Sequence, residues 1–238
     1  MPAQIRPGSA SSPPWHVTHV DETGSTNADL LAAAVAGAPD RSVLVAAHQT
    51  AGRGRLDRRW DAPPGANLLV SLLFRDVPEV PGALLRRVGV ATVDACRVVA
   101  AVDAVLKWPN DVLVADRKLA GILAERGVDG CVVVGLGLNV GWAPDGGTCL
   151  GGRTTPQEVL DALLAAYDGI GDDLEHAYRD RLSTVGRRVH VTLPRGAIDG
   201  LAVDVEPDGR LVVLDSAGVT HRLDVGDVVH VRPGVPPA

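Results

Sequence analysis

The chain has 238 residues, of which 46% are hydrophobic and 22% are charged, as in an ordinary globular protein with a full core. Its formal charge of −6 gives no general attraction to nucleic-acid phosphate, and it lacks the run of about 18 apolar residues that predicts a membrane span. We therefore expect neither nucleic acid nor membrane as a partner.

The first part of the chain is predicted to contain three strands and two helices. The elements in order are a disordered tail at 1–14, a strand at 15–20, a turn at 21–27, a helix at 28–36, a strand at 43–47, a strand at 67–74 and a helix at 84–102. Ser25, Thr26 or Asn27 is placed to cap the first helix. The strand at 67–74 is apolar on both faces, which predicts a central position in a covered sheet.

The second part begins with β-strands and one long helix and ends in short strands. The predicted elements are a strand at 105–114 broken by Pro109, strands at 119–125 and 131–140, a helix at 156–182 with an interruption at 169–171, and strands at 189–193, 200–206, 211–215, 219–223 and 228–231. Five short strands in about 45 residues predict a small barrel. A terminal tail follows at 234–238.

A loop at residues 48–60, here called the arginine loop, has a composition that no simple turn requires. It reads His-Gln-Thr-Ala-Gly-Arg-Gly-Arg-Leu-Asp-Arg-Arg-Trp. Glycine lets backbone N–H groups approach a ligand closely, and guanidinium groups bind carboxylates and phosphates through forked hydrogen bonds. The loop is therefore predicted to bind an anion, with Arg58 and Arg59 on a solvated face.

The lysines and cysteines are few, and their positions are informative. Of the 23 basic residues only Lys107 and Lys118 are lysines, so both are candidates for chemistry that needs a compact ammonium group. Cys96, Cys131 and Cys149 are widely spaced and form no C-x-x-C pair, which predicts free thiols in a reducing cytoplasm rather than disulfides or a zinc site.

Polar side chains gather at the ends of several predicted strands, where a mixed sheet commonly builds a ligand site. They are Ser25 to Asn27, the arginine loop, Lys107 to Asp111 with Lys118, and Asn139. Their cations, amides, carboxylate and aromatic plane suit a ligand with an acidic tail, phosphates and a flat base. Capping, turn formation and core packing remain alternative roles for individual members of the set.

These residues resemble the bacterial biotin protein ligases (biotin–acetyl-CoA-carboxylase ligases). The segments that carry the resemblance are Ser25-Thr26-Asn27, Gln49-x-x-Gly52-Arg53-Gly54-Arg55 with Trp60, Asn67 with Ser71, Lys107-Trp108-Pro109-Asn110-Asp111, Lys118-Leu119-Ala120-Gly121-Ile122-Leu123 and Gly135-Leu136-Gly137-Leu138-Asn139. Family members that also repress transcription carry a winged helix-turn-helix ahead of this region, where this chain has only about 15 residues. The resemblance is therefore to the monofunctional type without a DNA-binding domain.

The resemblance implies an α+β fold and an enzymatic activity. The fold would be a mixed β-sheet with packed helices, similar to class II aminoacyl-tRNA synthetases, over residues 15–184, followed by an SH3-like β-barrel over 185–233. The enzyme would be cytoplasmic, would activate biotin with Mg-ATP to biotinyl-5′-AMP, and would transfer biotin to one lysine of a biotin carboxyl carrier domain. The sequence does not distinguish a monomer from a homodimer.

The resemblance also implies roles for individual positions. The catalytic residues would be Arg53, Arg55 and Lys118. The biotin-binding residues would be Ser25, Thr26, Asn27, Gln49, Gly52, Arg53, Lys118, Gly121 and Gly137. The ATP-binding residues would be Arg55, Trp60, Lys107, Asn110 and Asn139, and Asp111 would bind Mg²⁺.

The alternative function is that of a lipoate or octanoate ligase or transferase of the same fold. Such an enzyme typically has a different glycine-rich signature in place of Gly52-Arg53-Gly54-Arg55. From another class, a regulator that only senses a small acid is expected to append a DNA-reading module. An inactive scaffold is disfavoured, because every charged position of the family pattern is present.

Overall fold

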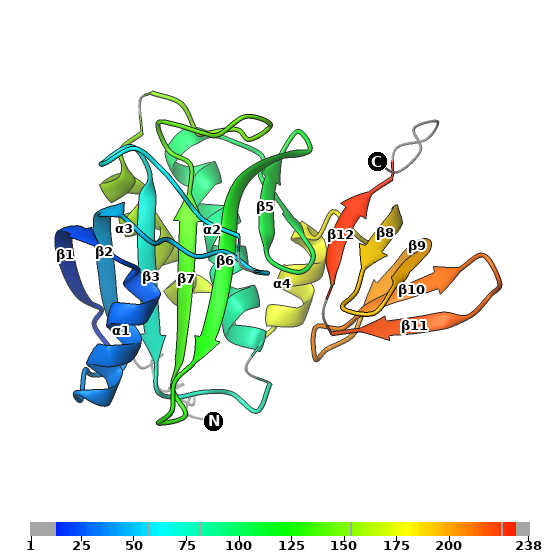
Figure 1. The fold of residues 1–238 in the computed structure, drawn as a ribbon, viewed down its shortest axis with the longest axis horizontal. Coiled ribbons are helices and arrows are strands. Elements are labelled where there is room, and N and C mark those ends of the chain that lie inside the picture. The colour runs from blue at the N-terminus through cyan, green and yellow to red at the C-terminus, as the bar shows by residue number, and fades with distance from the viewer. Residues whose placement is uncertain (1–12, 57, 81, 153, 225, 232–238) are drawn as a thin grey trace, which may run out of the picture.

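The computed structural model of the chain describes residues 13–56, 58–80, 82–152, 154–224 and 226–231. Their strands form a large sheet and a small C-terminal sheet that lies beside it (Figure 1). Most of the tail predicted at 1–14, all of the tail predicted at 234–238, and Asp57 of the arginine loop lie outside the described residues.

The large sheet has seven strands in the order β1-β2-β3-β7-β6-β5-β4. Strands β1 and β2 run parallel and the other neighbours run antiparallel, so the predicted mixed sheet is confirmed. The strands are β1 (His16–Thr23), β2 (Ser42–Gln49), β3 (Leu68–Phe74), β4 (Val105–Lys107), β5 (Asp111–Val114), β6 (Arg117–Arg126) and β7 (Val132–Leu138).

The helices of the described residues are α1 (Thr26–Val35), α2 (Gly82–Ala100), α3 (Pro156–Gly169) and α4 (Leu174–Arg181). Helix α3 begins at a capping box in which the side chains of Thr155 and Glu158 bond each other's backbone N–H groups. The interruption predicted within the long helix is confirmed, because α3 and α4 are separate. Within the described ranges, no helix is long and apolar enough to cross a membrane.

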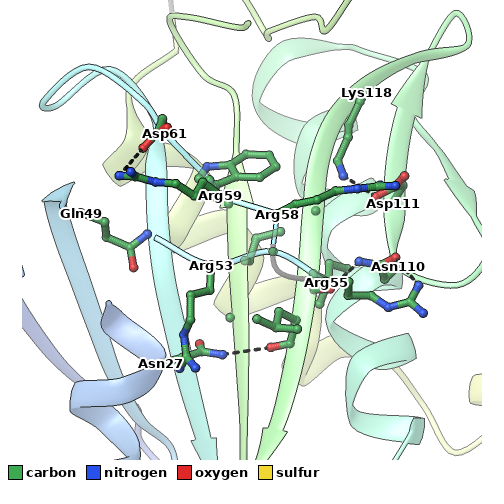
Figure 2. Close-up of a pocket in the computed structure, with 18 of the residues that line it drawn as sticks. Asn27, Gln49, Arg53, Arg55, Arg58, Arg59, Asp61, Asn110, Asp111 and Lys118 are labelled. Atoms are coloured by element: carbon green, nitrogen blue, oxygen red, sulfur yellow. Dashed lines mark hydrogen bonds and ion pairs between the residues drawn. The ribbon is translucent and has the colours of Figure 1, made fainter. Parts of the chain in front are cut away.

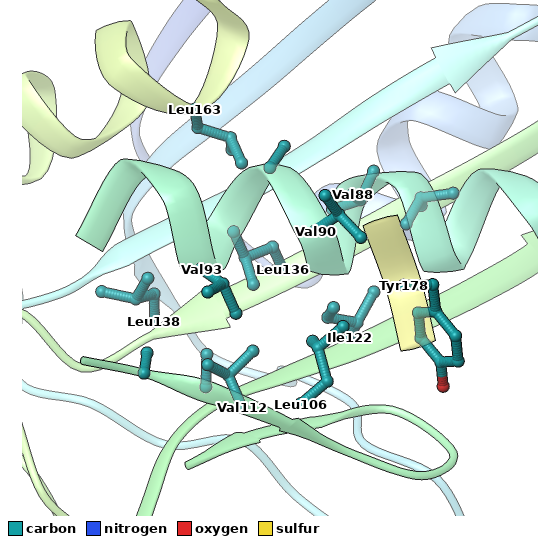
Figure 3. Packing of buried hydrophobic residues seen from close by; sticks show 14 of the residues in the cluster. Val88, Val90, Val93, Leu106, Val112, Ile122, Leu136, Leu138, Leu163 and Tyr178 are labelled. Carbon is teal, nitrogen blue, oxygen red and sulfur yellow. The ribbon is translucent and has the colours of Figure 1, made fainter. Parts of the chain in front are cut away.

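Side chains along β3 alternate between the two faces of the sheet. Leu72 and Phe74 belong to the main core beneath α2 and α3, whereas Leu73 packs with Leu30 of α1 on the opposite face. None of these residues is more than 4% exposed, so β3 is buried on both faces, as its mainly apolar sequence predicted. Figure 3 shows the main core, where α2 packs against the sheet and α3.

The small sheet is antiparallel, with the strand order β11-β10-β9-β8-β12. Its strands are β8 (Arg188–Thr192), β9 (Ala197–Val205), β10 (Leu211–Asp215), β11 (Thr220–Leu223) and β12 (Asp227–His230). All five predicted strands are therefore present. The ladders of the described residues leave β11 and β12 at the two edges of an open sheet.

Trp108 joins the two sheets through the turn between β4 and β5. Its backbone N–H donates to Thr184 Oγ1 at 3.0 Å, and its indole Nε1 donates to the Gly209 carbonyl at 2.9 Å. The side chain is 3% exposed, so the small sheet packs on a buried aromatic ring rather than on a solvated linker. The Trp108–Pro109 peptide is cis.

Some predicted boundaries were wrong. Strand β1 continues to Thr23, into the predicted turn, because it stays in register with β2 as far as Gln49. Helix α1 begins at Thr26, two residues before the predicted start. The segment predicted as one broken strand at 105–114 is a hairpin of β4 and β5, since Pro109 has no N–H group for a strand ladder.

A half-buried histidine at the junction of the two sheets predicts a pH-dependent stability. His230 lies 3.2 Å from Thr184 Oγ1 through Nε2 and 3.3 Å from Arg187 Nη1 through Nδ1. Burial first, and the positive charges of Arg187 and Lys107 second, lower the pKa of His230 to about 4, against a smaller opposing effect of Asp116. The neutral imidazole is therefore favoured in the folded chain.

Between about pH 6.5 and pH 4, the unfolded chain binds a proton at His230 that the folded chain does not bind. The contribution of neutral His230 to the free energy of unfolding is therefore complete above pH 6.5 and is lost as the pH falls toward 4. The side chain is only half-buried, so we expect a loss of about 1 kcal/mol by pH 5. Urea unfolding at pH 7 and pH 5 should show a larger drop for the wild type than for His230→Gln. Equal drops would contradict the prediction.

Candidate functional site

A pocket of about 370 Å³ lies on the α1 face of the large sheet, beneath the arginine loop (Figure 2). This volume falls within the range of small-molecule sites. The described residues that line the pocket include five basic side chains and three acidic ones. They are Arg53, Arg55, Arg58, Arg59 and Lys118, and Asp61, Asp111 and Asp227. A chain with a formal charge of −6 thus concentrates positive charge at this pocket.

Three glycines on β6 and β7 form the pocket floor, because they leave backbone where other residues would place side chains. Gly121 of β6 pairs with Gly137 of β7, and Gly135 lies on the same face. A Cβ atom on Gly137 would lie 2.3 Å from Trp60 Cε2, and one on Gly135 would lie 2.3 Å from Asn27 Oδ1. A larger residue at either position would displace a side chain of the pocket.

The first turn of α1, with Ser25, Thr26 and Asn27, forms a buried polar side of the pocket, here called the α1 wall. The backbone N–H and hydroxyl of Thr26 donate to Gln49 Oε1 at 2.8 and 3.1 Å. Ser71 Oγ of β3 lies 2.7 Å from Thr26 Oγ1 and 2.5 Å from Asn27 Oδ1. Ser25 precedes this turn at the N-cap, but its side chain makes no capping hydrogen bond, so capping does not account for it. The helix N-terminus also directs partial positive charge toward the pocket.

The arginine loop folds back on itself as a narrow hairpin. The Gly54 N–H donates to the Arg58 carbonyl at 2.7 Å, and the Trp60 N–H donates to the Gly52 carbonyl at 3.0 Å. A Cβ on Gly52 would lie 2.3 Å from the Trp60 carbonyl oxygen, so glycine is required where the two legs cross. This hairpin carries Trp60 inward over the pocket floor.

Trp60 covers the Gly121–Gly137 pair and borders the cationic part of the pocket. Its ring centroid is 5.6 Å from Lys118 Nζ, in a cation–π arrangement. Its indole Nε1 is buried and has no hydrogen-bond acceptor among the described residues. A buried donor without an acceptor is costly, so this N–H group is available to a bound ligand.

Arg53 and Arg55 of the loop contact different strands. Arg53 Nη2 donates to Glu125 Oε2 at 3.1 Å, and Arg55 Nη1 donates to Asn110 Oδ1 at 3.1 Å. Burial lowers the pKa of Arg55, with opposing effects of two acidic groups, but the guanidinium remains charged. The loop therefore places one guanidinium above the α1 wall and another above the turn between β4 and β5.

A carboxylate between two ammonium groups lies beneath Arg55. Lys118 Nζ is 2.6 Å from Asp111 Oδ1, and Lys107 Nζ is 3.7 Å from Asp111 Oδ2. The Asp111 side chain is 18% exposed, whereas the Lys118 side chain is 41% exposed. Lys118 is therefore held in place by Asp111 while its ammonium group stays accessible from the pocket.

The same residues bear on the predicted magnesium site. Among the described residues, no group of three His, Cys, Asp or Glu side chains could hold a metal ion. Asp111 offers a single carboxylate, and both of its oxygens face lysines. Asp111 could therefore serve as one ligand of Mg²⁺, provided that substrate phosphates and water supply the other oxygen ligands, as they commonly do for this ion.

The C-terminal sheet also reaches the pocket, which sequence reasoning missed. Asp227 of β12 lines the pocket and forms an ion pair with Arg58 of the arginine loop. The hydrogen bond to Asp227 is the main reason that the pKa of Arg58 is raised. Arg58 is largely solvated, as predicted, but it also links the loop to the small sheet. No local signal marks Asp227, which lies 169 residues from its partner.

The structure brings most of the predicted site residues into one pocket. Those that line it are Ser25, Thr26, Asn27, Gln49, Arg53, Arg55, Trp60, Asn110, Asp111, Lys118, Gly121, Gly137 and Asn139. Gly52 and Lys107 are not among the lining residues, but Gly52 lies against the Trp60 backbone and Lys107 pairs with Asp111. Asn139 is 2% exposed, accepts from Asn67 Nδ2 at 3.2 Å and donates to the Thr148 carbonyl at 3.0 Å, a geometry suited to holding strand ends in place.

Comparison with protein-family models gives two matches along the chain. Residues 21–139 match the biotin/lipoate A/B protein ligase family, and residues 184–231 match the biotin protein ligase C-terminal domain. The first match covers the pocket residues of α1, the arginine loop and β4 to β7. The second covers the small sheet and includes Asp227.

Individual relatives match most of the chain. The biotin–[acetyl-CoA-carboxylase] ligase of Mycobacterium tuberculosis is 43% identical over 90% of this chain and 88% of its own length. The enzyme of the same description from Paracoccus denitrificans is 31% identical over 82% of this chain and 93% of its own. The structure of the Aquifex aeolicus biotin protein ligase in complex with biotin and ATP superposes with a TM-score of 0.76 at 26% identity, over 91% of this chain and 99% of that one.

Proposed function

Because the chain belongs to the biotin/lipoate A/B protein ligase family and is a biotin protein ligase, we propose that the pocket beneath the arginine loop is its site of biotin activation. The observation that carries the proposal is the position of Lys118 Nζ, which is 2.6 Å from Asp111 Oδ1, beside Trp60 and above the glycine floor. A fixed cation next to an aromatic plane suits a carboxylate that reacts with a nucleotide.

The first step would join two anions, and the basic side chains would make this possible. A carboxylate oxygen of biotin attacks the α-phosphorus of ATP, a P–O bond forms, and pyrophosphate leaves. Lys118, Arg53 and Arg55 would lower the repulsion between carboxylate and phosphate and would stabilise the charge on the five-coordinate phosphorus. No protein nucleophile takes part in this step.

We propose the following division of the pocket between the substrates. Ser25, Thr26, Asn27 and Gln49 would hold the biotin head group against the backbone of Gly52, Gly121 and Gly137. Trp60 would stack on adenine, and its unpaired indole N–H would donate to the ligand. Lys107, Asn110 and Asn139 would position the phosphates, directly or through Asp111. Among these residues, Asp111 would hold Mg²⁺, which would supply positive charge against the phosphates.

The second step would transfer biotin to a protein. The amine of an acceptor lysine attacks the carbonyl carbon of biotinyl-5′-AMP, an amide bond forms, and AMP leaves. We propose that the acceptor is a biotin carboxyl carrier domain, because relatives are described as biotin–[acetyl-CoA-carboxylase] ligases. We propose that residues 15–184 form the catalytic domain and residues 185–233 the C-terminal domain. A cytoplasmic location agrees with the three free cysteines.

The decisive experiment is ATP–pyrophosphate exchange with the purified enzyme, started either with biotin or with lipoate. We expect exchange with biotin and at most a trace with lipoate, followed by labelling of one lysine on a purified carrier domain. Exchange that prefers lipoate would replace this proposal with the lipoate ligase alternative. Absence of exchange with both acids would contradict adenylate formation in this pocket.

Replacing Arg55 should make the enzyme release its reactive intermediate. In Arg55→Gly the contact with Asn110 is lost, so the arginine loop is expected to close less completely over biotinyl-5′-AMP and to admit water. We expect more free biotinyl-5′-AMP and more biotin on bystander proteins than with the wild type. Ala51→Gly is the matched control, since it also adds a glycine to the loop, whereas Ala51 is exposed and is not among the residues that line the pocket. Weaker ATP binding without extra bystander labelling would refute the retention role.

A further inference from the structure

Glu125 connects the arginine loop to the α1 wall of the pocket. It lies near the end of β6, on the same face as Gly121, and its Oε2 accepts two hydrogen bonds. One comes from Asn27 Nδ2 at 2.7 Å and the other from Arg53 Nη2 at 3.1 Å. No role was predicted for this carboxylate from the sequence, and it does not itself line the pocket.

The two partners of Glu125 differ in burial and in the element that carries them. Asn27 is 4% exposed, and its amide also donates to the Leu123 carbonyl at 3.2 Å, so it is fixed on the sheet. The Arg53 side chain is 48% exposed and belongs to the loop. One oxygen of Glu125 therefore accepts hydrogen bonds both from a buried residue of the α1 wall and from a half-exposed cation of the arginine loop.

We propose that Glu125 is a positioning residue for biotin activation, a role that rests on the function proposed above. Its carboxylate holds Arg53 beside the α1 wall before substrates bind, and it gives up Arg53 when the carboxylate and phosphate of the substrates compete for the guanidinium. Glu125 acts through Arg53 and Asn27 and does not touch the reacting atoms.

Replacing Glu125 by the substrates as the partner of Arg53 costs little free energy. A half-exposed ion pair shifts a conformational equilibrium by only about two- to fivefold, so anionic substrates can replace it. With Arg53 in place, the Glu125 side chain is already 24% exposed to water, and it also accepts a hydrogen bond from Asn27 that does not involve Arg53. The carboxylate is therefore not left as a buried charge without a partner.

Limited proteolysis of the substrate-free enzyme tests the holding contact, because trypsin cleaves after arginines of the loop. In Glu125→Gln we expect cleavage after Arg55 and Arg58 to be about threefold faster than in the wild type, and the difference to disappear with saturating biotin and ATP. Glu22→Gln is the matched control, since Glu22 also pairs with a loop side chain, His48, but is 63% exposed. Cleavage at the wild-type rate would overturn the proposal.

A double-mutant cycle separates positioning from a general loss of structure. If Glu125 acts through Arg53, then Glu125→Gln has no further effect on cleavage after Arg55 and Arg58 in an Arg53→Gln background. An equal effect in both backgrounds would show that Glu125 only supports the fold. Should Glu125→Gln not fold, Glu125→Asp is the second variant, because it retains the charge on a shorter side chain. Its cleavage is expected to be faster than that of the wild type but less than threefold faster. A rate equal to that of the wild type would contradict the role.

Kinetics give a third measurement that a purely structural role would not reproduce. For Glu125→Gln in pyrophosphate exchange, we expect the KM for biotin to fall by up to about threefold while kcat stays within about twofold of the wild type, because the substrates no longer have to break the ion pair between Glu125 and Arg53. A rise in KM would contradict the role, and so would a fall in kcat with an unchanged KM. Proteolysis without substrates does not depend on activity. A wild-type cleavage rate in Glu125→Gln would therefore show that this inference fails, whereas absence of pyrophosphate exchange in the wild type would show that the proposed function fails.

Discussion

Lys118→Ala is expected to lower biotin-dependent ATP–pyrophosphate exchange by about 10²- to 10³-fold, equivalent to about 3–4 kcal/mol of barrier. The ammonium group is the pocket cation held by Asp111 at 2.6 Å, and it lies beside the ring of Trp60. Its loss would leave the repulsion between a carboxylate and an α-phosphate only partly screened. Since the side chain is 41% exposed, we expect little change in the free energy of unfolding.

Two further variants make the Lys118 prediction specific. Lys118→Arg keeps the charge but replaces a compact ammonium with a planar fork, so we expect only partial activity. Arg126→Ala removes an exposed cation from the other end of β6, outside the pocket, and should leave exchange within about threefold of the wild type. Near-normal pyrophosphate release by Lys118→Ala would rule out the assigned role.

Trp108→Ala is expected to lower the free energy of unfolding by about 3–5 kcal/mol, a large part of the stability of an ordinary domain. The indole is 3% exposed and belongs to the main core, and its N–H group bonds the Gly209 carbonyl of the small sheet. Truncation would create a cavity at the junction of the two sheets. The ion pair between Arg58 and Asp227 spans the same junction, so activity should fall as well.

Trp108→Phe separates the cavity from the hydrogen bond. It retains most of the buried ring but cannot donate to Gly209, so we expect a loss of about 1–2 kcal/mol. Urea unfolding of both variants and the wild type measures the differences. If Trp108→Ala unfolded within 1 kcal/mol of the wild type, association of the small sheet would not depend on this residue.

Much of the fold could be predicted because burial leaves a local pattern in the sequence. All residues of β3 except Ser71 are apolar, since both faces of that strand are covered, whereas β8 and β9 of the small sheet alternate between more buried and more exposed residues. The errors fell at boundaries. Strand β1 extends to Thr23 because it pairs with β2 as far as that residue. The local sequence of the segment does not indicate this pairing with a strand further along the chain.

The candidate site was predictable where its residues are adjacent in sequence. The glycines and arginines of the arginine loop, the pair of lysines and the glycine pattern of β7 are unusual in themselves, and their order matches a known family. Glu125 and Asp227 were not predicted. Each is an ordinary acidic residue whose partner lies 72 or 169 positions away, so sequence alone gives no reason to single it out.

By itself, the sequence determined the chemistry available to this protein, namely guanidinium and ammonium groups for an acid and a nucleotide, and the glycines that leave room for them. Only the tertiary structure decided how that chemistry is assembled. Pairing of β6 with β7 brings Gly121 opposite Gly137, and packing of the small sheet brings Asp227 to Arg58. The physical reason is that side-chain type is local, whereas distance between side chains depends on strand register and on burial of the whole core.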